Sequence, residues 1–348
     1  MKTALRSTLL VVVGMVALAA LSPVAALADG PLSVQLQLGD RCVRGHKPSD
    51  LSVKVKLLRH DGSAIETKHD DTVSLNWSVC FQHVPVAGNK LQLRNSTFER
   101  TATVPDLTLD VDRVASVVRG HAPANKTVEV TYLDCRLQLI CVIHAPSFPV
   151  NVNSQGRFHK DLSPPIDIDG ADEVDVLYQD AAEDAFSRAT EVPYLQVTKP
   201  DRIRLSCAPR GTTTVRLLSA TGAQRATESF HAAQDCRSLS GSFRKNGQAV
   251  NVHTGDRIVS DFATDARIVW PVMSVDGQGT TLVGRCLKDS PWVVFVSHGP
   301  SAAMFSGTTD AAGHFSFDTA TWHFGAGDVL DLVCETGPGD RVRMVRTL

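Results

Sequence analysis

The sequence predicts an all-β protein built from four tandem β-sandwich modules. Three observations support this: strand patterns that alternate apolar and polar residues, turn signals such as Asp61-Gly62 between them, and marker motifs that repeat in step along the chain. Helical patterns are scarce. The best candidate, residues 180–190, aligns with residues 335–345, where Gly-Pro-Gly-Asp requires a turn, so we expect a hairpin at both places.

The first marker is a Val-Arg-Gly-His segment at the edge of a strand. Residues 43–48 read Val-Arg-Gly-His-Lys-Pro, and residues 118–123, 75 positions later, read Val-Arg-Gly-His-Ala-Pro. The alternating segment that begins at Val53 also recurs 75 positions later, in the segment that begins at Val128. Weaker copies stand later in the chain. The alternation predicts half-buried strands of antiparallel sheet.

The second marker is a Gly-x-Phe segment that opens a strand, followed after 13 or 14 positions by an acidic residue that opens the next. Glycine permits a positive φ at the turn, so each Phe is expected to be the first inward side chain of a core strand. The first module has only weak substitutes, including Asn89-Lys90-Leu91. The three Phe and Asp pairs are Phe158 with Asp172, Phe243 with Asp256, and Phe315 with Asp328.

The third marker is a proline followed by alternating apolar residues. Proline lacks a ladder N–H and stiffens a short junction, so it suits a boundary between modules. The prolines are Pro31, Pro105, Pro193 and Pro271, at intervals of 74, 88 and 78 residues. The expected modules are module 1 (residues 29–104), module 2 (105–192), module 3 (193–270) and module 4 (271–348).

Residues 1–28 have the pattern of a secretory signal peptide. Lys2 and Arg6 precede an apolar run of about 13 residues, shorter than the roughly 20 of a membrane span, and the triplet at 26–28 suits cleavage. An N-terminal anchor is the less favoured alternative. We expect a secreted or cell-surface chain with no membrane span in its mature part. Removing Lys2 and Arg6 leaves 33 basic against 37 acidic residues, which predicts no nucleic-acid partner.

Eight cysteines lie in the mature chain, two in each predicted module. An even count in an exported protein predicts four disulfides, and the even distribution favours pairing within modules. The second partner shifts position between modules, so these are not the fixed inter-sheet bridge of antibody domains. The short 135–141 loop is expected to be structural rather than redox-active. The expected pairs are Cys42–Cys80, Cys135–Cys141, Cys207–Cys236 and Cys286–Cys334.

Little in the sequence points to catalysis. There is no Gly-x-Ser-x-Gly motif and no His or Cys cluster with zinc spacing. His46 and His121 hold the same place in two modules, so duplication explains them and we expect structural roles. A pair of glycosidase carboxylates stays open, because such residues need not be close in sequence. We expect a protein that is not an enzyme and needs no cofactor.

Two candidate binding sites remain. The acidic run 167–175 offers Asp167, Asp169 and Asp172 as candidate Ca²⁺ ligands beside a glycine, but it lacks the bidentate Glu of a calcium loop, and a solvated loop is the favoured interpretation. Trp322, between two strands of module 4, is the best candidate for an exposed aromatic platform that binds a saccharide. The other tryptophans of modules 3 and 4 are expected to be packed.

Residues 309–315 read Thr-Asp-Ala-Ala-Gly-His-Phe and residues 327–329 read Gly-Asp-Val. This phrase resembles the immunoglobulin-like repeats of bacterial secreted and cell-surface proteins; modules 2 and 3 keep part of it, and module 1 departs from it. The resemblance implies tandem Ig-like β-sandwich modules in a semi-rigid rod, with a non-catalytic role in adhesion, display or envelope structure. Its partner would be an extracellular protein or a glycan. The alternative is a carbohydrate-binding protein or an accessory chain of a hydrolase.

Overall fold

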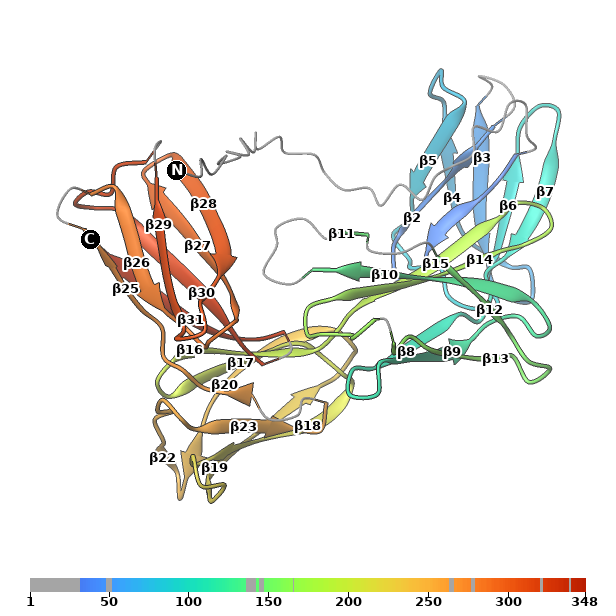
Figure 1. Cartoon of the computed structure of the whole chain (residues 1–348). Coiled ribbons are helices and arrows are strands. Elements are labelled where there is room, and N and C mark those ends of the chain that lie inside the picture. The colour runs from blue at the N-terminus through green and yellow to red at the C-terminus, as the bar shows by residue number, and fades with distance from the viewer. Residues whose placement is uncertain are drawn as a thin grey trace, which may run out of the picture.

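The computed structural model shows an all-β chain of tandem Ig-like sandwiches (Figure 1). The structure describes residues 32–47, 52–135, 142–143, 147–164, 166–262, 266–276, 279–319, 322–337 and 339–348. The predicted signal peptide, residues 1–28, lies outside them. The described part of the chain has strands throughout and contains no helix of the length and apolar character of a membrane span.

One long sheet runs through modules 1 and 2, which we call the first half. Its strands lie in the order β11 (Val142–Ile143), β10 (Thr127–Asp134), β14 (Glu173–Gln179), β15 (Ala185–Glu191), β1 (Gln35–Gln37), β2 (Cys42–His46) and β5 (Asn76–Cys80), with β12 (Phe148–Asn151) also paired to β10. The second half, modules 3 and 4, has the matching sheet: β20 (Arg237–Ser242), β17 (Arg202–Ala208), β16 (Tyr194–Lys199), β31 (Asp340–Thr347), β30 (Val329–Gly337), β27 (Pro291–His298) and β28 (Ser301–Thr308).

The two halves share one topology. In the first half β1, which opens module 1, pairs in parallel with β15, which ends module 2. In the second half β16 pairs in parallel with β31 in the same way. The hairpins β14–β15 and β30–β31 stand where the sequence predicts them. The chain therefore repeats a unit of two modules, whose sheets cross the boundaries that the prolines predict.

Each module completes its sandwich with a smaller sheet. The sheets are β4 (Ala64–Asp70), β3 (Val53–Leu58), β6 (Lys90–Arg94) and β7 (Glu99–Thr103) in module 1; β13 (Arg157–Asp161), β9 (Val117–His121) and β8 (Thr108–Asp112) in module 2; β22 (Gln248–Ala249), β21 (Arg244–Lys245), β19 (Gln224–Ala232), β18 (Gly211–Leu218), β23 (Arg257–Ser260) and β24 (Ala266–Arg267) in module 3; and β25 (Val272–Val275), β26 (Thr281–Arg285) and β29 (His314–Asp318) in module 4.

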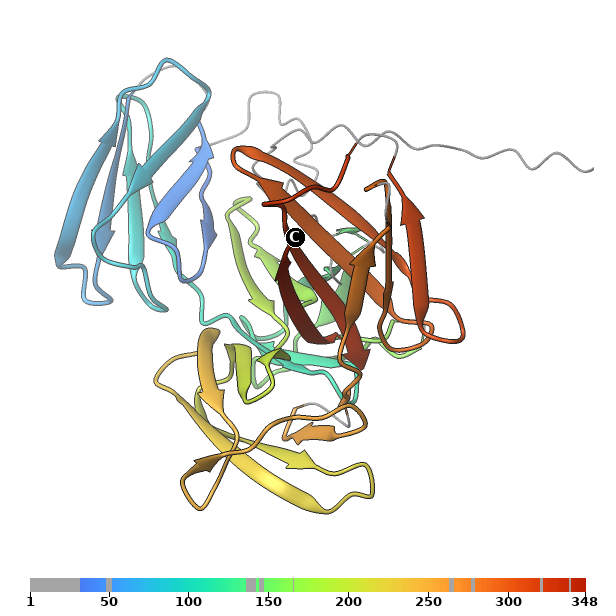
Figure 2. The same ribbon diagram turned by 90° about the vertical axis from the view of Figure 1, so that its left-hand side faces the viewer.

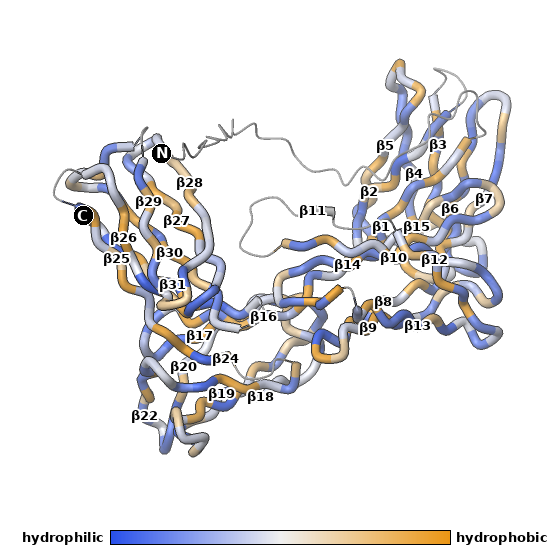
Figure 3. Tube along the Cα trace, viewed as in Figure 1, coloured by the Kyte–Doolittle hydropathy of each residue, from blue (hydrophilic) through white to orange (hydrophobic). Residues whose placement is uncertain are grey.

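Alternation along the strands builds the core. In β3, Val53, Val55 and Leu57 are fully buried while the lysines between them face outward. Figure 3 shows this alternation along the strands of both halves. The buried residues of modules 1 and 2 form a single cluster, and Val342 of module 4 joins the core of module 3. Neighbouring modules thus share apolar packing as well as a sheet.

The four modules do not stand in a straight line. Figures 1 and 2 show modules 1 and 4 as two arms that rise from a base formed by modules 2 and 3. Pro193 lies between β15 of module 2 and β16 of module 3, within the base. The semi-rigid rod expected from the sequence is bent into a V.

The glycine of the Val-Arg-Gly-His marker makes room for an aromatic ring. Gly45 lies opposite Trp77 on β5, and Gly120 lies opposite Phe158 on β13. A Cβ on Gly120 would stand 2.7 Å from the Phe158 ring. Glycine is needed for close approach at these positions, and neither has a positive φ. Module 4 repeats the pair as Gly284 and Phe315.

Module 3 fills the same space differently. Leu205 on β17 lies opposite Leu239 on β20, at the place that corresponds to Gly45 and Trp77. Two medium side chains replace a glycine and a large ring, which conserves core volume. The prediction for the third Gly-x-Phe is therefore wrong in register: Gly241 lies inside β20 opposite Ile203, without a positive φ, and Phe243 is buried just after that strand.

The acidic residue that follows each Gly-x-Phe segment, or the asparagine in its place in module 1, closes the same turn in every module. Its side chain accepts the backbone N–H of the residue three positions earlier, at 2.7–3.0 Å. The residue before it has a positive φ, which Ala171 adopts where the other modules have glycine. Module 1 uses an asparagine. The four closing residues are Asn89, Asp172, Asp256 and Asp328.

We predict that Gly120→Ala lowers the free energy of unfolding by about 1–3 kcal/mol, because the new methyl group would meet the carbonyl oxygen of Thr108 and the Phe158 ring and push both neighbouring strands away. Gly325→Ala is the matched control. No atom lies within 4 Å of its would-be Cβ, so its change should stay within about 0.5 kcal/mol. Urea denaturation followed by tryptophan fluorescence measures both; equal effects would contradict the close-packing explanation.

Candidate functional site

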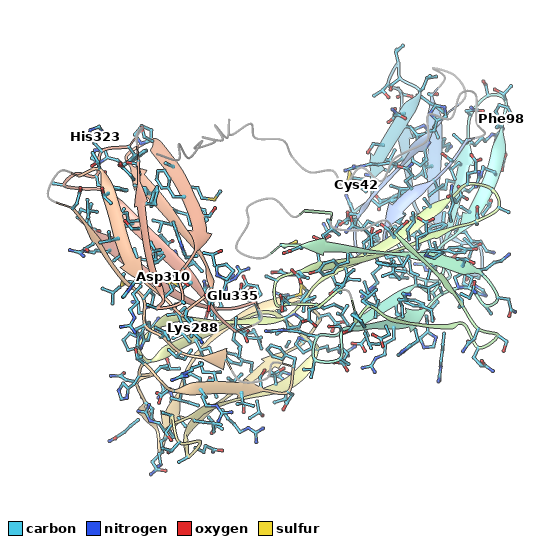
Figure 4. All side chains as sticks on the ribbon, viewed as in Figure 1. Cys42, Phe98, Lys288, Asp310, His323 and Glu335 are labelled. Carbon is cyan, nitrogen blue, oxygen red and sulfur yellow. A yellow bond between two sulfur atoms is a disulfide. The ribbon has the colours of Figure 1, made fainter. Side chains whose placement is uncertain are left out.

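Three of the expected disulfides lie within the described residues. The structure joins Cys42 to Cys80, Cys207 to Cys236, and Cys286 to Cys334. Cys42 and Cys80 stand directly opposite each other on β2 and β5, so this bridge crosses one strand pair (Figure 4 labels Cys42). Cys135 is also disulfide-bonded, and its predicted partner Cys141 lies outside the described residues. Each described bridge links two segments of one predicted module.

A buried ion pair joins the two halves. Arg113, which follows β8 in module 2, donates two hydrogen bonds of 3.2 Å to the carboxylate of Asp340, at the start of β31 in module 4. The same guanidinium donates to the carbonyl oxygen of Pro193 at 3.1 Å, and Asp340 accepts the backbone N–H of Leu195 at 2.8 Å. Both side chains are almost fully buried, at 5% and 1% exposure. Three modules therefore meet at one bidentate pair.

The acidic run of module 2 packs into this junction. Residues 168–172 are buried, and a Cβ on Gly170 would stand 2.6 Å from the Cβ of Tyr194 in module 3. Gly170 also lies against Gly339, one residue before Asp340. The expectation of a solvated loop is therefore wrong: the run turns inward because the second half covers it.

The three predicted Ca²⁺ ligands lie in different surroundings. Asp167 is exposed and accepts from the Ser116 hydroxyl at 3.4 Å, whereas Asp169 is buried. Asp172 accepts the Tyr132 hydroxyl at 2.7 Å and two backbone N–H groups. Burial raises the pKa of Asp172 to about 6, although these hydrogen bonds oppose the rise. Its oxygens are engaged by the chain's own donors, and the calcium site stays a prediction.

A second group of carboxylates lies on the outer side of the hairpin β14–β15. Glu173 and Glu191 stand directly opposite each other, and Asp175 follows on the same face. Burial, then the nearby charge of Glu173, raises the pKa of Asp175 to about 6. Burial also raises the pKa of Glu173 and of Glu191, and the charge of Arg341 partly offsets this at Glu191. The face holds three carboxyl groups that favour protonation.

Glu191 also belongs to a group of metal-type ligands. Its carboxylate and the sulfur atoms of Cys207 and Cys236 lie within 4.8 Å of one another, the one such group among the described residues. The two sulfur atoms are bonded to each other, which removes the thiolates that a metal would need.

Trp322 is half-buried rather than a free platform. Its indole N–H donates to Asp328 at 3.1 Å, and its ring packs against the core of module 4. Burial tends to raise the pKa of Asp328, but hydrogen bonds from Gly325, Trp322 and His298 outweigh it and hold that pKa low. The ring therefore supports the turn that Asp328 closes. Its use as a saccharide platform stays a prediction.

Phe98 is the one strongly exposed aromatic side chain among the described residues, at 49%. It ends the turn between β6 and β7, where its N–H donates to Asn95 at 2.6 Å. Figure 4 places it at the end of module 1 far from the other modules. The sequence signal was the Asn-Ser-Thr-Phe turn, which lies outside every repeat marker.

Two hollows on the described surface bear on possible binding. A small one, of about 70 Å³, lies on the outer face of β3 and β6 and is lined mainly by cationic side chains. A wider and open one, of about 580 Å³, lies over the sheet β25–β26–β29, where Val272 and Val283 are exposed. The sequence had shown Lys54 and Lys56 only as polar alternates of a strand. Gln92 and Arg94 come from β6, which only the strand order places beside β3, so no local signal in the sequence points to this hollow.

Comparison with known proteins assigns the chain to no family. No family model and no curated protein matches the sequence. Solved structures that resemble the chain include a tetra-tandem repeat from the extending region of a large adhesion protein (14% identity, 91% of this chain and 99% of that one, TM-score 0.20), trypsin-activated alpha-2-macroglobulin from Escherichia coli (8%, 92% and 31%, 0.19) and the FN1–FN3 domains of chicken CNTN1 (6%, 70% and 97%, 0.16). These proteins have different roles, so the similarity carries no role to this chain.

We predict that Arg113→Ala destabilises the junction by about 3–5 kcal/mol, because it leaves Asp340 charged and buried without a counter-ion. The double variant Arg113→Ala/Asp340→Asn should lose less than Arg113→Ala alone, since the unpaired charge is gone. Thermal and chemical unfolding of the full chain measure both. A double variant as unstable as the sum of the two single variants would contradict the pairing.

We predict that Asp175→Asn flattens the pH dependence of stability. Burial holds its folded pKa at about 6, above the ordinary value of 3.8, so protonated Asp175 stabilises the fold relative to the ionised form. That contribution is fully present below pH 3.8 and is lost as the pH rises through 6. The fall in unfolding free energy between pH 4 and 7 should shrink by an amount on the order of 2 kcal/mol. The exposed Asp106→Asn in the same module should leave the fall unchanged.

Proposed function

We propose that this protein is a non-catalytic bracket of the cell surface or the secreted fraction, which holds four Ig-like sandwiches in a fixed V for adhesion or display. The observation that carries the proposal is the buried pair of Arg113 and Asp340, which ties module 2 to modules 3 and 4. A flexible string of modules would have no need of a desolvated ion pair at its centre.

Two further features support a rigid frame. A shared sheet ties the two modules of each half together, because β1 and β16 pair directly with the last strand of the neighbouring module. Disulfides inside modules 1, 3 and 4 also cross-link segments within each of these modules. Disulfides also suit an extracytoplasmic location, where they persist.

The buried acidic groups favour a structural role over a catalytic one. Asp172, Asp340 and Asp328 are each engaged by backbone or side-chain donors of the chain itself. A catalytic carboxylate needs an oxygen directed at substrate. The alternative of a carbohydrate-binding protein that works through Trp322 gains no support, because Asp328 holds its indole N–H.

Small-angle X-ray scattering of the mature protein tests the bracket. We predict a single bent particle whose distance distribution matches the V of Figure 1. Arg113→Ala should broaden that distribution toward larger distances, because the halves come apart at the junction. The control Arg119→Ala removes an exposed ion pair with Asp110 in the same module and should change nothing. A straight rod, or a flexible ensemble for the unaltered chain, would overturn the proposal.

A further inference from the structure

The outer face of the smaller sheet of module 1 carries a row of cations. Lys54 and Lys56 on β3 point away from the core, as do Lys90 and Arg94 on β6. Lys54 pairs in register with Arg94. We call these four side chains the basic face. Among the strand residues on this side of the sheet, Glu99 is the single carboxylate, and it pairs with Arg94 at 3.6 Å.

Most of this charge is uncompensated. Within the described part of the chain, Lys54, Lys56 and Lys90 make no ion pair and no side-chain hydrogen bond, and none of them has an acidic residue directly opposite on a neighbouring strand. The hollow of about 70 Å³ lies among Lys54, Lys56, Gln92, Arg94 and Glu99. Repulsion between these cations is a cost to the fold that a bound anion would remove.

Module 3 keeps two of the four cationic positions. Strands β3 and β18 carry a bulge at the same place, after Leu57 and after Leu217, so Lys56 corresponds to Arg216. By the same register Lys90, opposite Leu58, corresponds to Arg257, opposite Leu218. The two halves thus keep cations at matched outer positions although their sequences there differ.

The balance of basic and acidic residues also differs between modules. Module 3 has eleven Lys or Arg against six Asp or Glu, and module 1 has ten against eight. Module 2 has seven against fifteen. The excess of basic residues therefore belongs to the modules that carry the matched cationic positions, within a chain that is acidic as a whole.

Spacing on the face suits a chain of anionic groups. Alternate residues on one strand stand about 6.8 Å apart and neighbouring strands about 4.8 Å, which sets the cations on a grid. The face is polar, and its hollow of about 70 Å³ is small. Such a grid can meet successive charges of an extended polymer better than it can enclose one small ligand.

We propose that the basic face of module 1, with its counterpart in module 3, binds an acidic polysaccharide, a glycan chain that carries carboxylate, sulfate or phosphate groups. This gives a partner class to the adhesive role proposed above and rests on it. Two sites on one bracket would strengthen attachment to a polymer long enough to reach both.

Two features favour a glycan over other polyanions. Strands β3, β4, β6 and β7 contain no Phe, Tyr or Trp on which successive nucleic-acid bases could stack. They also expose no large apolar side chain of the kind that anchors a protein in a membrane surface. Phe98, where the row of Arg94 and Glu99 ends, offers one exposed ring for the apolar side of a sugar.

The test compares retention of the mature protein on immobilised dextran sulfate and on neutral dextran, across a salt gradient. We expect binding to dextran sulfate only. The variant Lys54→Glu/Lys56→Glu/Lys90→Glu should bind about tenfold or more weakly and elute at lower salt. The milder Lys54→Gln/Lys56→Gln/Lys90→Gln should weaken binding in the same direction, which keeps the test valid where charge reversal disturbs folding.

The matched control is Lys126→Glu/Arg157→Glu/Lys288→Glu, which makes the same change in net charge at exposed positions of modules 2 and 4. It should bind within about twofold of the unaltered chain. Equal weakening in the two charge reversals would overturn the proposal, as would absence of binding to dextran sulfate. So would equally tight binding to oligo-dT or to phosphatidylserine–phosphatidylcholine vesicles.

Small-angle scattering distinguishes a failure of the glycan-binding proposal from a failure of the proposed bracket. Lys54→Gln/Lys56→Gln/Lys90→Gln should scatter as the unaltered chain does, so a failure of retention leaves the bracket standing. A chain that binds dextran sulfate but scatters as a straight rod would instead overturn the bracket and retain the basic face.

Discussion

Two buried aspartates, Asp184 and Asp340, hold the architecture together. Each stands at the start of the last strand of a half and accepts a backbone N–H from the first strand of that half, from Val34 at 2.9 Å and from Leu195 at 2.8 Å. Each also receives an arginine, Arg100 in one case and Arg113 in the other. The carboxylate satisfies a donor that the parallel pairing alone would leave buried and unmatched.

The two arginines belong to different parts of the chain relative to their aspartates, and this difference decides whether the ion pair lies within one half or between the halves. Arg100 lies on β7 of module 1, so it closes the half to which Asp184 belongs. Arg113 lies in module 2, so it reaches out of its own half to Asp340. The same Arg–Asp arrangement therefore holds one half together when both residues belong to that half, and joins the two halves when the arginine belongs to the other half. The buried pair favours this arrangement of the halves, because within it the loss of either partner leaves a desolvated charge unpaired.

Local features of the fold could be predicted from the sequence, and features that join distant segments could not. Period-2 alternation identified strands such as β3 and β10, and glycine with φ of +75° and +83° preceded Phe158 and Phe315 as expected. Gly241 followed the same spelling by chance, because a three-residue motif does not encode register. The pairing of β1 with β15 joins residues about 150 positions apart and has no local signature.

The acidic run and the basic face show the same limit of prediction from sequence. The acidic run is locally indistinguishable from a solvated loop, and only the second half, packed over Gly170, makes it buried. Lys54 and Lys56 look like ordinary outward residues of one strand. Their meaning as part of a basic face depends on Arg94 and Lys90, which the sheet brings beside them. Charge patterns on sheets become visible only when strand order and register are known.

The parallel pairing at the ends of each half has a mechanical consequence. β1 enters from the N-terminal side and β15 leaves toward the C-terminal side, so tension between the ends of the half slides one strand along the other. All the hydrogen bonds between the two strands are then loaded together in shear, rather than opened one at a time as in a hairpin pulled from its open end. β16 and β31 have the same geometry. A chain arranged in this way resists stretching along its length most strongly at the two places where its modules are joined.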